Sequence, residues 1–388
     1  MCVLSHYMRC KSQYTLRLLL QSVVVARNSS SSAFSKTLAW NFKDTASINE
    51  ILDLLVNGDR SALSKTITLL ESSRQDHREK SKLLLDAIMR MNHNLNHDNH
   101  DKSSYRIGLT GPPGAGKSTF IEKFGMKYLN GELGTGTEDN YLAVLAIDPS
   151  SMRTGGSLLG DKTRMTELSY HPRAFIRPSC SGNHLGGVSR STNENILLCE
   201  AAKFNTILVE TVGVGQSEYS VSDMVDLFVL IIPPAGGDEL QGIKKGIIEY
   251  VDIVLVNKSD GDLLPAARRV AGEYKSALKY SHSRHKGWSP KVIMISSETG
   301  HGIDDFWKAA GEFKRKRLEE KEFFQHRQNQ ILNWMNQYIT DGLWKSFRSH
   351  PNVVNSLGKI NDKVKAGQLT PGSAADLLIR EYTKERVS

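Results

Sequence analysis

The chain has 388 residues, of which 39% are hydrophobic and 24% are charged, and its formal net charge is +8. This length suits two or three domains, or one large domain with appendages. The composition excludes a disordered polymer, a fibrous repeat and a multi-span membrane protein, and the 4 cysteines are too few for a disulfide-stapled secreted scaffold. The positive charge suggests nucleic acid or a membrane surface as a partner, unless it is confined to one segment.

The first 43 residues hold six basic side chains and no acidic one, because the first acidic residue is Asp44. Without those six charges the net charge falls to +2. The segment is rich in serine, and its apolar run over residues 16–26 is too short for a transmembrane helix. Such a composition is typical of mitochondrial presequences. We therefore predict a presequence over residues 1–43, and we expect neither nucleic acid nor a membrane as a partner of the mature chain.

Residues 44–103 are expected to form a small helical domain that ends in a polar linker. Apolar residues recur at helical spacing between Ile48 and Met89, in groups that predict two or three helices. Residues 92–104 are polar and low in complexity, which is typical of a solvated boundary segment. A helix could instead align three histidines of this segment as metal ligands: His93, His97 and His100.

Residues 104–302 alternate between strand-like apolar runs and helical stretches. The expected strands cover residues 105–109, 141–147, 206–209, 227–232, 252–256 and 292–295. This alternation implies right-handed crossovers and a mainly parallel sheet that is covered on both faces by helices. We therefore predict an α/β fold for this part of the chain.

Residues 303–388 are expected to form a helical arm and tail. The pattern from Gly302 to about Ser349 indicates one long charged helix or a pair of helices with many aromatic side chains. Such a surface either packs back on the α/β domain or forms a subunit interface. Pro371 and Gly372 predict a turn within the helical tail.

Residues 111–118 match the P-loop pattern G-x-x-x-x-G-K-[ST] between a predicted strand and a predicted helix. Glycines let successive backbone N–H groups converge on a phosphate, and the helix N-terminus adds its dipole. We expect Lys117 to reach the β- and γ-phosphates and Ser118 to ligate Mg²⁺. The predicted phosphate-binding residues are Gly111, Pro112, Pro113, Gly114, Ala115, Gly116, Lys117, Ser118 and Thr119.

Residues 257–260 follow a predicted strand and match the N-K-x-D pattern of GTPases. The Asp260 carboxylate can accept two hydrogen bonds from guanine, whereas adenine would leave it unpaired at a high energetic cost. The loop after the last predicted strand lies at the position where GTPases place a loop behind the guanine. The predicted base-binding residues are Asn257, Lys258, Asp260, Ser296, Ser297 and Glu298.

The segment Glu210-Thr211-Val212-Gly213 ends a predicted strand and is similar to the D-x-x-G loop, with Glu in place of Asp. Glu210 can hold Mg²⁺ through a water, and the Gly213 N–H can sense the γ-phosphate. Asp148 and Asp161 are further candidates for the outer shell of the metal. For each of these two carboxylates a helix cap or a turn is the alternative.

Six motifs together closely resemble the MeaB/ArgK branch of the P-loop GTPases. They are GPPGAGKST (111–119), LAIDPSS (145–151), GGSLLGDKTRM (155–165), ETVGVGQSE (210–218), GDELQGIKKGI (237–247) and VNKSDGD (256–262). The resemblance extends from about Ile48 to the C-terminus, and Glu210 agrees with it. The stretch between Cys180 and His184 is less regular, so we assign no role to that loop.

The resemblance implies a homodimeric, Mg²⁺-dependent GTPase of the mitochondrial matrix. It implies a G-protein chaperone that gates loading of adenosylcobalamin into methylmalonyl-CoA mutase, protects the mutase and promotes exchange of inactivated cofactor. The cobalamin would be handled by the mutase and not held tightly by this chain. The cobalamin adenosyltransferase is a further candidate partner, and the aromatic C-terminal helices fit the dimerisation arm of the family.

The resemblance also implies roles for single residues. Ser118, Asp148, Asp161 and Glu210 match the Mg²⁺ and switch positions of the family. Residues 237–247 resemble a switch that faces the partner, where Lys244 or Lys245 could offer a cation to the transition state. Simple solvent exposure is the alternative for both lysines.

Two other functions stay open at this point. A P-loop kinase that phosphorylates a protein or a small molecule would share the phosphate site but would give residues 257–260 no role. A metal-delivery GTPase would need a Cys/His relay, which only the histidines of residues 93–100 could supply.

Overall fold

The computed structural model describes residues 42–72, 74–96, 103–134, 140–148, 165–180, 185–211, 217–234, 245–279 and 284–383. The chain divides into two units, Met1–Glu50 and Ile51–Ser388. Of the first unit only the beginning of helix α2 (Phe42–Val56) is described. The predicted presequence therefore lies almost entirely outside the described residues, and the predicted domain boundaries stay predictions.

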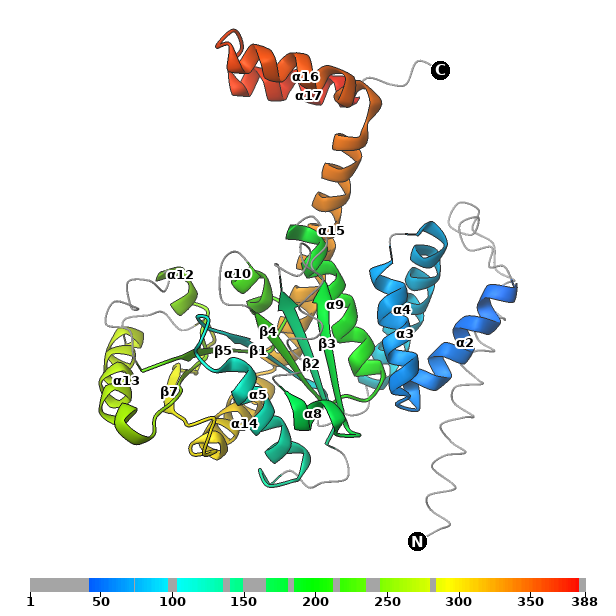
Figure 1. Cartoon of the computed structure of the whole chain (residues 1–388). Helices are drawn as coiled ribbons and strands as arrows, with labels where there is room; N and C mark the ends of the chain where they lie inside the picture. Colours follow the sequence, from blue (N-terminus) through cyan, green and yellow to red (C-terminus); the bar gives the residue numbers. More distant parts are fainter. Residues whose placement is uncertain are drawn as a thin grey trace. The chain divides into compact units, whose positions relative to one another are not determined.

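The second unit is built on a parallel seven-stranded sheet with the order β3-β2-β4-β1-β5-β6-β7 (Figure 1). Its strands are β1 (Tyr105–Thr110), β2 (Leu142–Asp148), β3 (Ala174–Cys180), β4 (Thr206–Thr211), β5 (Leu227–Ile232), β6 (Ile253–Val256) and β7 (Lys291–Met294). Each of the six expected strands is present, and the predicted α/β fold is confirmed. Strand β1 lies between β4 and β5, so the P-loop that follows it starts near the middle of the sheet.

Strand β3 is the one strand that the sequence pattern did not predict. It contains Pro178, which cannot donate to a ladder and is tolerated mainly in edge strands. The strand pairs with β2 alone and forms one edge of the sheet, so this position suits a proline. The strand ends at Cys180, where the less regular stretch begins, and residues 181–184 lie outside the described part.

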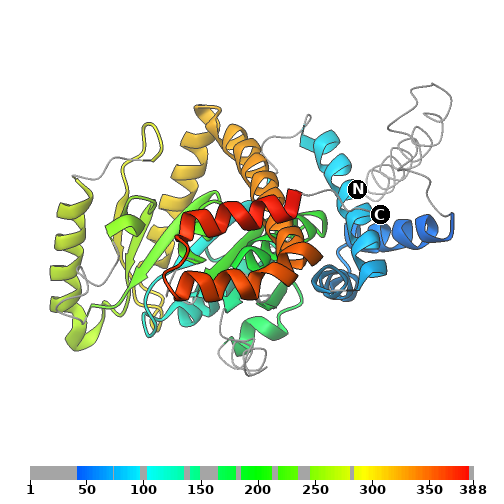
Figure 2. The same cartoon turned by 90° about the horizontal axis from the view of Figure 1, so that it is seen from above.

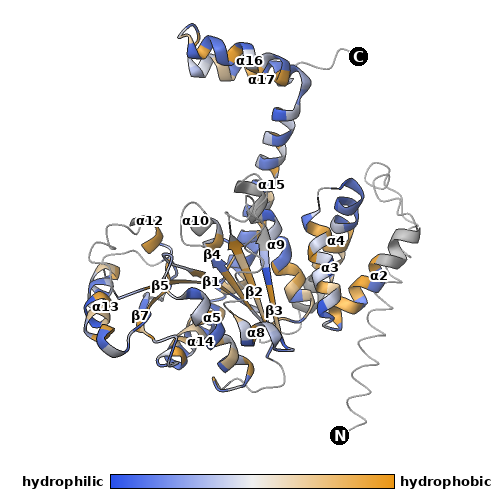
Figure 3. Cartoon of the chain, viewed as in Figure 1, coloured by the Kyte–Doolittle hydropathy of each residue, from blue (hydrophilic) through white to orange (hydrophobic). Residues whose placement is uncertain are grey.

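Helices cover both faces of the sheet because its strands are apolar on both sides (Figure 3). One face packs on α5 (Lys117–Leu129), α8 (Thr166–Tyr170) and α14 (Ile303–Glu319). The other packs on α9 (Leu185–Ala201) and α10 (Ser217–Ser222), and α15 (Glu322–Ser349) packs against α9. Helices α12 (Lys245–Ile248) and α13 (Leu264–Leu278), with the short 3-10 turn η4 (Gly261–Leu263), flank β5, β6 and β7.

The described part of the N-terminal helical region contains three helices, within the two or three that the apolar spacing predicted. After α2 come α3 (Arg60–Glu71) and α4 (Gln75–Asn96), and both pack against α9. Asp59 caps α3 by accepting a hydrogen bond from the Ala62 N–H at 2.7 Å. Helix α4 continues to Asn96, so helical structure extends into the segment expected to be a linker.

The C-terminal region is a pair of long helices followed by a helical hairpin (Figure 2). Phe306 and Phe313 of α14 are fully buried in the main core, so this helix packs back on the domain. The second half of α15 instead exposes large apolar side chains. The tail forms α16 (Pro351–Lys365) and α17 (Pro371–Thr383), which begins at the predicted turn. Among the described helices, none combines the length and the apolarity that crossing a membrane requires.

Candidate nucleotide site

The P-loop connects β1 to α5, which begins at Lys117, and two of its glycines lie where a side chain would clash. A Cβ on Gly111, which has a φ of +149°, would lie 1.9 Å from the Ile231 carbonyl oxygen. A Cβ on Gly116, which has a φ of +89°, would lie 2.4 Å from Nδ2 of Asn257. The glycines thus let the loop pass close to β5 and to the N-K-x-D segment, which no larger residue would permit.

The Lys117 side chain lies inside the curl of this loop. It is 8% exposed, and its Nζ donates to the carbonyl oxygens of Gly111 at 2.6 Å and of Pro112 at 3.1 Å. The loop is therefore shaped around an ammonium group at the start of a helix. Both features favour an anion, because the helix dipole and the cation act in the same direction.

Ser118 and Glu210 come together across the neighbouring strands β1 and β4. The Ser118 Oγ donates to Oε1 of Glu210 at 3.3 Å, and Glu210 is 8% exposed. A hydroxyl and a carboxylate are oxygen ligands of the kind that Mg²⁺ prefers, and phosphates and waters complete such a site in nucleotide-binding proteins. The pair therefore fits a Mg²⁺ ion that is bound together with a nucleotide.

The ends of β1 and β4 are also joined by their last residues. The Thr211 hydroxyl donates to the Thr110 hydroxyl at 3.0 Å, and both threonines are fully buried. Sequence reasoning missed this contact, although threonine at the last position of both strands was a visible signal. The contact fixes the strand end that carries Glu210 against the strand end that carries the P-loop.

Asn257 connects three loops of the site. Its Nδ2 donates to the Ala115 carbonyl oxygen at 2.8 Å, and its Oδ1 accepts from the Ser297 N–H at 3.0 Å and from the Ser297 hydroxyl at 2.8 Å. Asn257 is 1% exposed, so these bonds form in an environment where an unmet polar group is costly. The structure thus brings the P-loop, the N-K-x-D segment and the last predicted loop together.

Asp260 lies beside the same last loop. The Ser296 hydroxyl donates to Oδ2 of Asp260 at 2.7 Å and also accepts from the Thr299 N–H at 3.1 Å. Lys258 has a φ of 57°, which makes a sharp turn between Asn257 and Asp260. Lys258 and Glu298 are exposed, whereas Ser297 is buried. The carboxylate is held at the carboxyl edge of the sheet, as guanine recognition requires.

Several predicted site residues lie at or beyond the limits of the described structure. Asp148 ends β2 beside β4, because Ile147 pairs with Thr211, but its side chain is not described. Lys245 is the first residue of α12, and its side chain is likewise not described. Outside the described residues lie Asp161, Gly213 and Lys244.

The alternative metal site also stays untested. His93 belongs to α4 without a described side chain, while His97 and His100 lie outside the described residues. Among the side chains that the structure does describe, no three His, Cys, Asp or Glu residues cluster as metal ligands. Cys199 is a free, buried thiol, as expected, and burial raises its pKa far above the usual value.

A parallel sheet with a P-loop after its central strand, a carboxylate on the next strand and an N-K-x-D segment beside it defines a P-loop GTPase. Residues 63–352 match the family model described as "Methylmalonyl Co-A mutase-associated GTPase MeaB". The chain therefore belongs to the MeaB family, and it is a GTPase.

Individual relatives agree with this assignment. A Mus musculus protein named "Methylmalonic aciduria type A homolog, mitochondrial" is 48% identical over 342 residues, which cover 88% of this chain and 80% of that protein. The "GTPase ArgK" of Escherichia coli is 43% identical over 290 residues, which cover 75% of this chain and 83% of that protein. This chain is thus homologous to the methylmalonic aciduria type A protein.

A solved structure shares the fold. A crystal structure titled "LAO/AO transport system kinase" superposes with a TM-score of 0.68 at 33% identity, covering 86% of this chain and 97% of that one. Its title names a kinase, whereas the family model and the curated relatives above are named GTPases. The family assignment therefore favours the GTPase over the P-loop kinase for this chain.

Proposed function

We propose that this chain is a Mg²⁺-dependent GTPase that acts as a chaperone of adenosylcobalamin-dependent methylmalonyl-CoA mutase. In this role it gates loading of the cofactor, protects the mutase and promotes exchange of inactivated cobalamin. The observation that carries the proposal is the match of residues 63–352 to a family described by its association with methylmalonyl Co-A mutase. The mutase handles the cobalamin, and the cobalamin adenosyltransferase is a further candidate partner.

In the proposed site the P-loop residues 111–119 bind the phosphates. Lys117 exchanges its contacts with the Gly111 and Pro112 carbonyls for the β- and γ-phosphate oxygens, so the loop is already shaped for the anion. Ser118 and Glu210 hold Mg²⁺, with Asp148 and Asp161 in its outer shell. When bound by these residues, the metal would supply neutralisation of the charge that develops on the phosphate oxygens during hydrolysis.

The proposed base site lies on the other side of the P-loop. Asp260 accepts hydrogen bonds from guanine while the Ser296 hydroxyl holds one of its oxygens in place. Asn257 keeps this segment at a fixed distance from the P-loop through Ala115. Lys258, Ser297 and Glu298 complete the loops around the base. Base recognition and phosphate binding are thus supported by one hydrogen-bonded unit.

The proposed switch is the segment that begins at Glu210 and includes Gly213, whose N–H senses the γ-phosphate. Binding of the mutase favours the active state of this segment and accelerates hydrolysis, which is the two-state behaviour of G proteins. Lys244 or Lys245, in the segment that resembles a partner-facing switch, supplies a cation to the transition state.

We also propose that the chain forms a homodimer through its arm. The exposed large apolar side chains of the arm are Ile331, Leu332, Met335, Ile339, Leu343, Trp344, Val354, Leu377 and Ile379. Several of them lie on one helix at successive turns, which is a surface that a monomer would leave in water. Light scattering after size exclusion tests this: the wild type should have twice the mass of the chain, and Leu343→Glu should shift it toward the monomer.

The proposed location is the mitochondrial matrix. Relatives from Mus musculus and Caenorhabditis elegans are named mitochondrial, and the acid-free leader has the composition of a presequence. Import of the leader fused to a fluorescent protein tests this. A fusion that stays in the cytosol would contradict the proposed location.

The chaperone proposal is tested by GTP hydrolysis with and without added methylmalonyl-CoA mutase. We expect release of free phosphate, a faster rate in the presence of the mutase and weak competition by ATP. A rate that the mutase leaves unchanged, together with no co-elution of the two proteins, would refute the proposed partner. Label from the γ-phosphate that appears on an acceptor molecule would restore the kinase alternative.

A further inference from the structure

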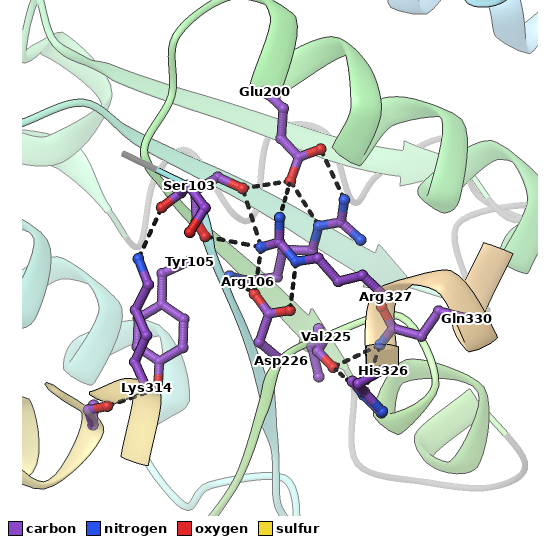
Figure 4. Close-up of polar contacts among 12 residues, drawn as sticks. Ser103, Tyr105, Arg106, Glu200, Val225, Asp226, Lys314, His326, Arg327 and Gln330 are labelled. Carbon is purple, nitrogen blue, oxygen red and sulfur yellow. Dashed lines mark hydrogen bonds and ion pairs between the residues drawn. The ribbon is translucent and has the colours of Figure 1, made fainter. Parts of the chain in front are cut away.

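Helix α15 holds the short segment that follows α10, which is the next described helix after the proposed switch segment. The segment, residues 222–226, connects α10 to β5. The indole Nε1 of Trp334 donates to the Asp223 carbonyl oxygen at 3.3 Å, and Nε2 of Gln330 donates to the Val225 carbonyl oxygen at 2.8 Å (Figure 4 shows the second bond). Gln330 is 2% exposed and Trp334 is 6% exposed. Two backbone carbonyls of the segment therefore have buried partners on the same helix.

The end of the segment is held more strongly. Arg327 of α15 binds the Asp226 carboxylate with two hydrogen bonds, from Nε at 2.8 Å and from Nη2 at 2.6 Å (Figure 4). The same carboxylate accepts from the Arg106 backbone N–H at 2.9 Å, and the Asp226 N–H donates to the Arg106 carbonyl. A bidentate pair of this kind fixes orientation as well as distance. Helix α15 and strand β1 thus hold the start of β5 jointly.

The segment has no free space toward the sheet. A Cβ on Gly108 of β1 would lie 2.9 Å from Cγ2 of Val225 and 3.0 Å from Cγ1 of Val221 in α10. Gly108 lies on β1, the strand that leads into the P-loop, three residues before Gly111. Because packed interiors transmit displacement rather than absorb it, a shift of α15 moves α10 against β1.

A second contact connects α10 to the element that follows the partner-facing segment. Arg284 donates to the Ser222 carbonyl at 3.3 Å and to the Asp223 carboxylate at 3.1 Å, and its guanidinium lies 5.3 Å from the Tyr250 ring centroid. Tyr250 follows α12 and packs edge-on against Tyr219 of α10 at 5.5 Å. Arg284 therefore ties the end of α10 to the end of α12.

We propose that α15 positions α10, the helix that follows the proposed switch segment, and that Gln330 and Trp334 are positioning residues for GTP hydrolysis. Helix α10 is the next described element after β4, the strand that carries Glu210, and α15 is the helix whose far half exposes the apolar arm. The position of the arm and the state of the γ-phosphate sensor are thus coupled through residues 222–226. The inference rests on the switch role given to Glu210 and Gly213 in the proposed function.

The coupling is reciprocal, because an arm that favours one position of α10 must itself respond to the nucleotide. GDP lacks the γ-phosphate and, in the proposed site, is bound by the P-loop and the guanine loops, whereas the described hydrogen bonds of Gln330 and Trp334 go to residues 225 and 223. The arm should therefore influence turnover of GTP and leave the affinity for GDP unchanged. This separation distinguishes a positioning role from a general effect on folding.

The test compares Gln330→Met with Gln328→Met in the full-length protein. Methionine keeps the length of the side chain and removes the N–H donor, and Gln328 is an exposed residue of the same helix. We expect Gln330→Met to lower kcat for GTP hydrolysis about fivefold, since the buried hydrogen bond to Val225 and the contact with Nε2 of His326 are lost, with KM and GDP affinity changed less than about twofold. Trp334→Phe, which keeps the ring and loses the N–H, should have a similar effect.

Hydrogen exchange measured by mass spectrometry gives the second readout. In the wild type, replacing GDP by a non-hydrolysable GTP analogue should change the exchange of α10 and of residues 327–338 in α15. Gln330→Met should abolish the change in α15, and Gln328→Met should retain it.

Equal rates for the two glutamine variants, or a parallel loss of GDP affinity and thermal stability in Gln330→Met, would overturn the inference. The inference would also be overturned if hydrogen exchange of α15 in the wild type were the same with GDP and with the GTP analogue. These outcomes are independent of the mutase, because all of them are measured without it. Failure of the mutase to stimulate hydrolysis would refute the proposed partner and leave the positioning role intact.

Discussion

The strands of the central sheet start at one edge, the amino edge, and end at the opposite one, the carboxyl edge. Charged residues have different kinds of partners at these two edges. At the amino edge, Arg106, Glu200, Asp226 and Arg327 form a buried network in which each charge is paired with an opposite one (Figure 4). At the carboxyl edge, Lys117 contacts backbone carbonyls, and the Glu210 carboxylate accepts from a hydroxyl at 3.3 Å. The described contacts of the amino edge are ion pairs, whereas those of Lys117 and Glu210 include backbone carbonyls and a hydroxyl, which a ligand can displace.

This difference separates structural from functional charge. Burial alone would raise the pKa of Asp226, but the Arg327 charge overrides it and holds the pKa below its usual range. Replacing Arg327 by a ligand would cost Asp226 a buried opposite charge, so we do not expect this pair to open for a ligand. A carbonyl or a hydroxyl is a weaker partner for an ion than an opposite charge, so Lys117 and Glu210 can exchange these contacts for phosphate and metal.

Lys117→Ala should have the largest effect on the carboxyl edge. Without the ammonium, neither the ground-state phosphate nor the developing charge is compensated, so GTP hydrolysis should fall about a thousandfold. The matched control is Lys127→Ala on the same helix, whose Nζ pairs with Asp304 at 2.8 Å outside the site. Phosphate release should stay within about twofold of wild type in that control. A near-normal rate for Lys117→Ala would contradict the phosphate site.

At the amino edge the largest effect is expected for Arg327→Met, and the property affected is stability instead of hydrolysis. The substitution leaves the buried Asp226 without its bidentate partner, so the free energy of unfolding should fall by about 3 kcal/mol. Arg315→Met removes an exposed pair with Glu319 and should change it by less than about 0.5 kcal/mol. Urea unfolding measures both variants. If Arg327→Met were as stable as Arg315→Met, the network would not be structural.

The carboxyl edge could largely be predicted from sequence because its parts are contiguous motifs. The P-loop and the N-K-x-D segment each occupy one short stretch after an apolar strand, so their proximity follows from a parallel sheet. Strand β3 was missed because Pro178 argues against a central strand, and only pairing in three dimensions shows that it lies at an edge. The roles of the site residues stay predictions.

The amino-edge network could not be predicted. Arg106 and Glu200 are 94 residues apart, and Arg106 and Asp226 are 120 apart, with no motif that links them. Each lies at the end of a strand or helix, where an exposed charge is the usual case. What makes them partners is the strand order, which places β1 between β4 and β5. The same holds for the contact of Gln330 with Val225.

Asp260→Asn tests whether the carboxyl edge selects the base. The amide cannot accept both hydrogen bonds from guanine, so GTP affinity should fall about a hundredfold, and xanthosine triphosphate should bind better because its 2-oxo group suits the amide. The Ser296 hydroxyl can still donate to the amide oxygen, so the loop itself should persist. Titration with fluorescent nucleotide analogues measures both affinities. Unchanged affinity for GTP would exclude Asp260 as the guanine contact.

The smallest effect is expected for His326→Gln at the amino edge, where the substitution should change how stability depends on pH. Burial, reinforced by the charge of Arg284, lowers the pKa of His326 to about 4, so the folded protein keeps this ring neutral. The unfolded chain takes up the proton near pH 6.5, and stability is therefore lost as the pH falls from about 6.5 toward 4. Because the ring is partly exposed, its share should be about 1 kcal/mol between pH 7.5 and 5.

The measurement is urea unfolding of wild type and His326→Gln at both pH values. The loss of stability on acidification should be smaller in the variant, since glutamine cannot take up a proton. His285, whose pKa burial lowers to about 3, packs edge-on against His326 with ring centroids 5.8 Å apart and feels its charge, so the difference between the two proteins includes the response of His285. An identical loss in both would mean that His326 is already charged in the folded state. The amino edge would then tolerate a cation beside Arg284, and its closed pairing of charges would be incomplete.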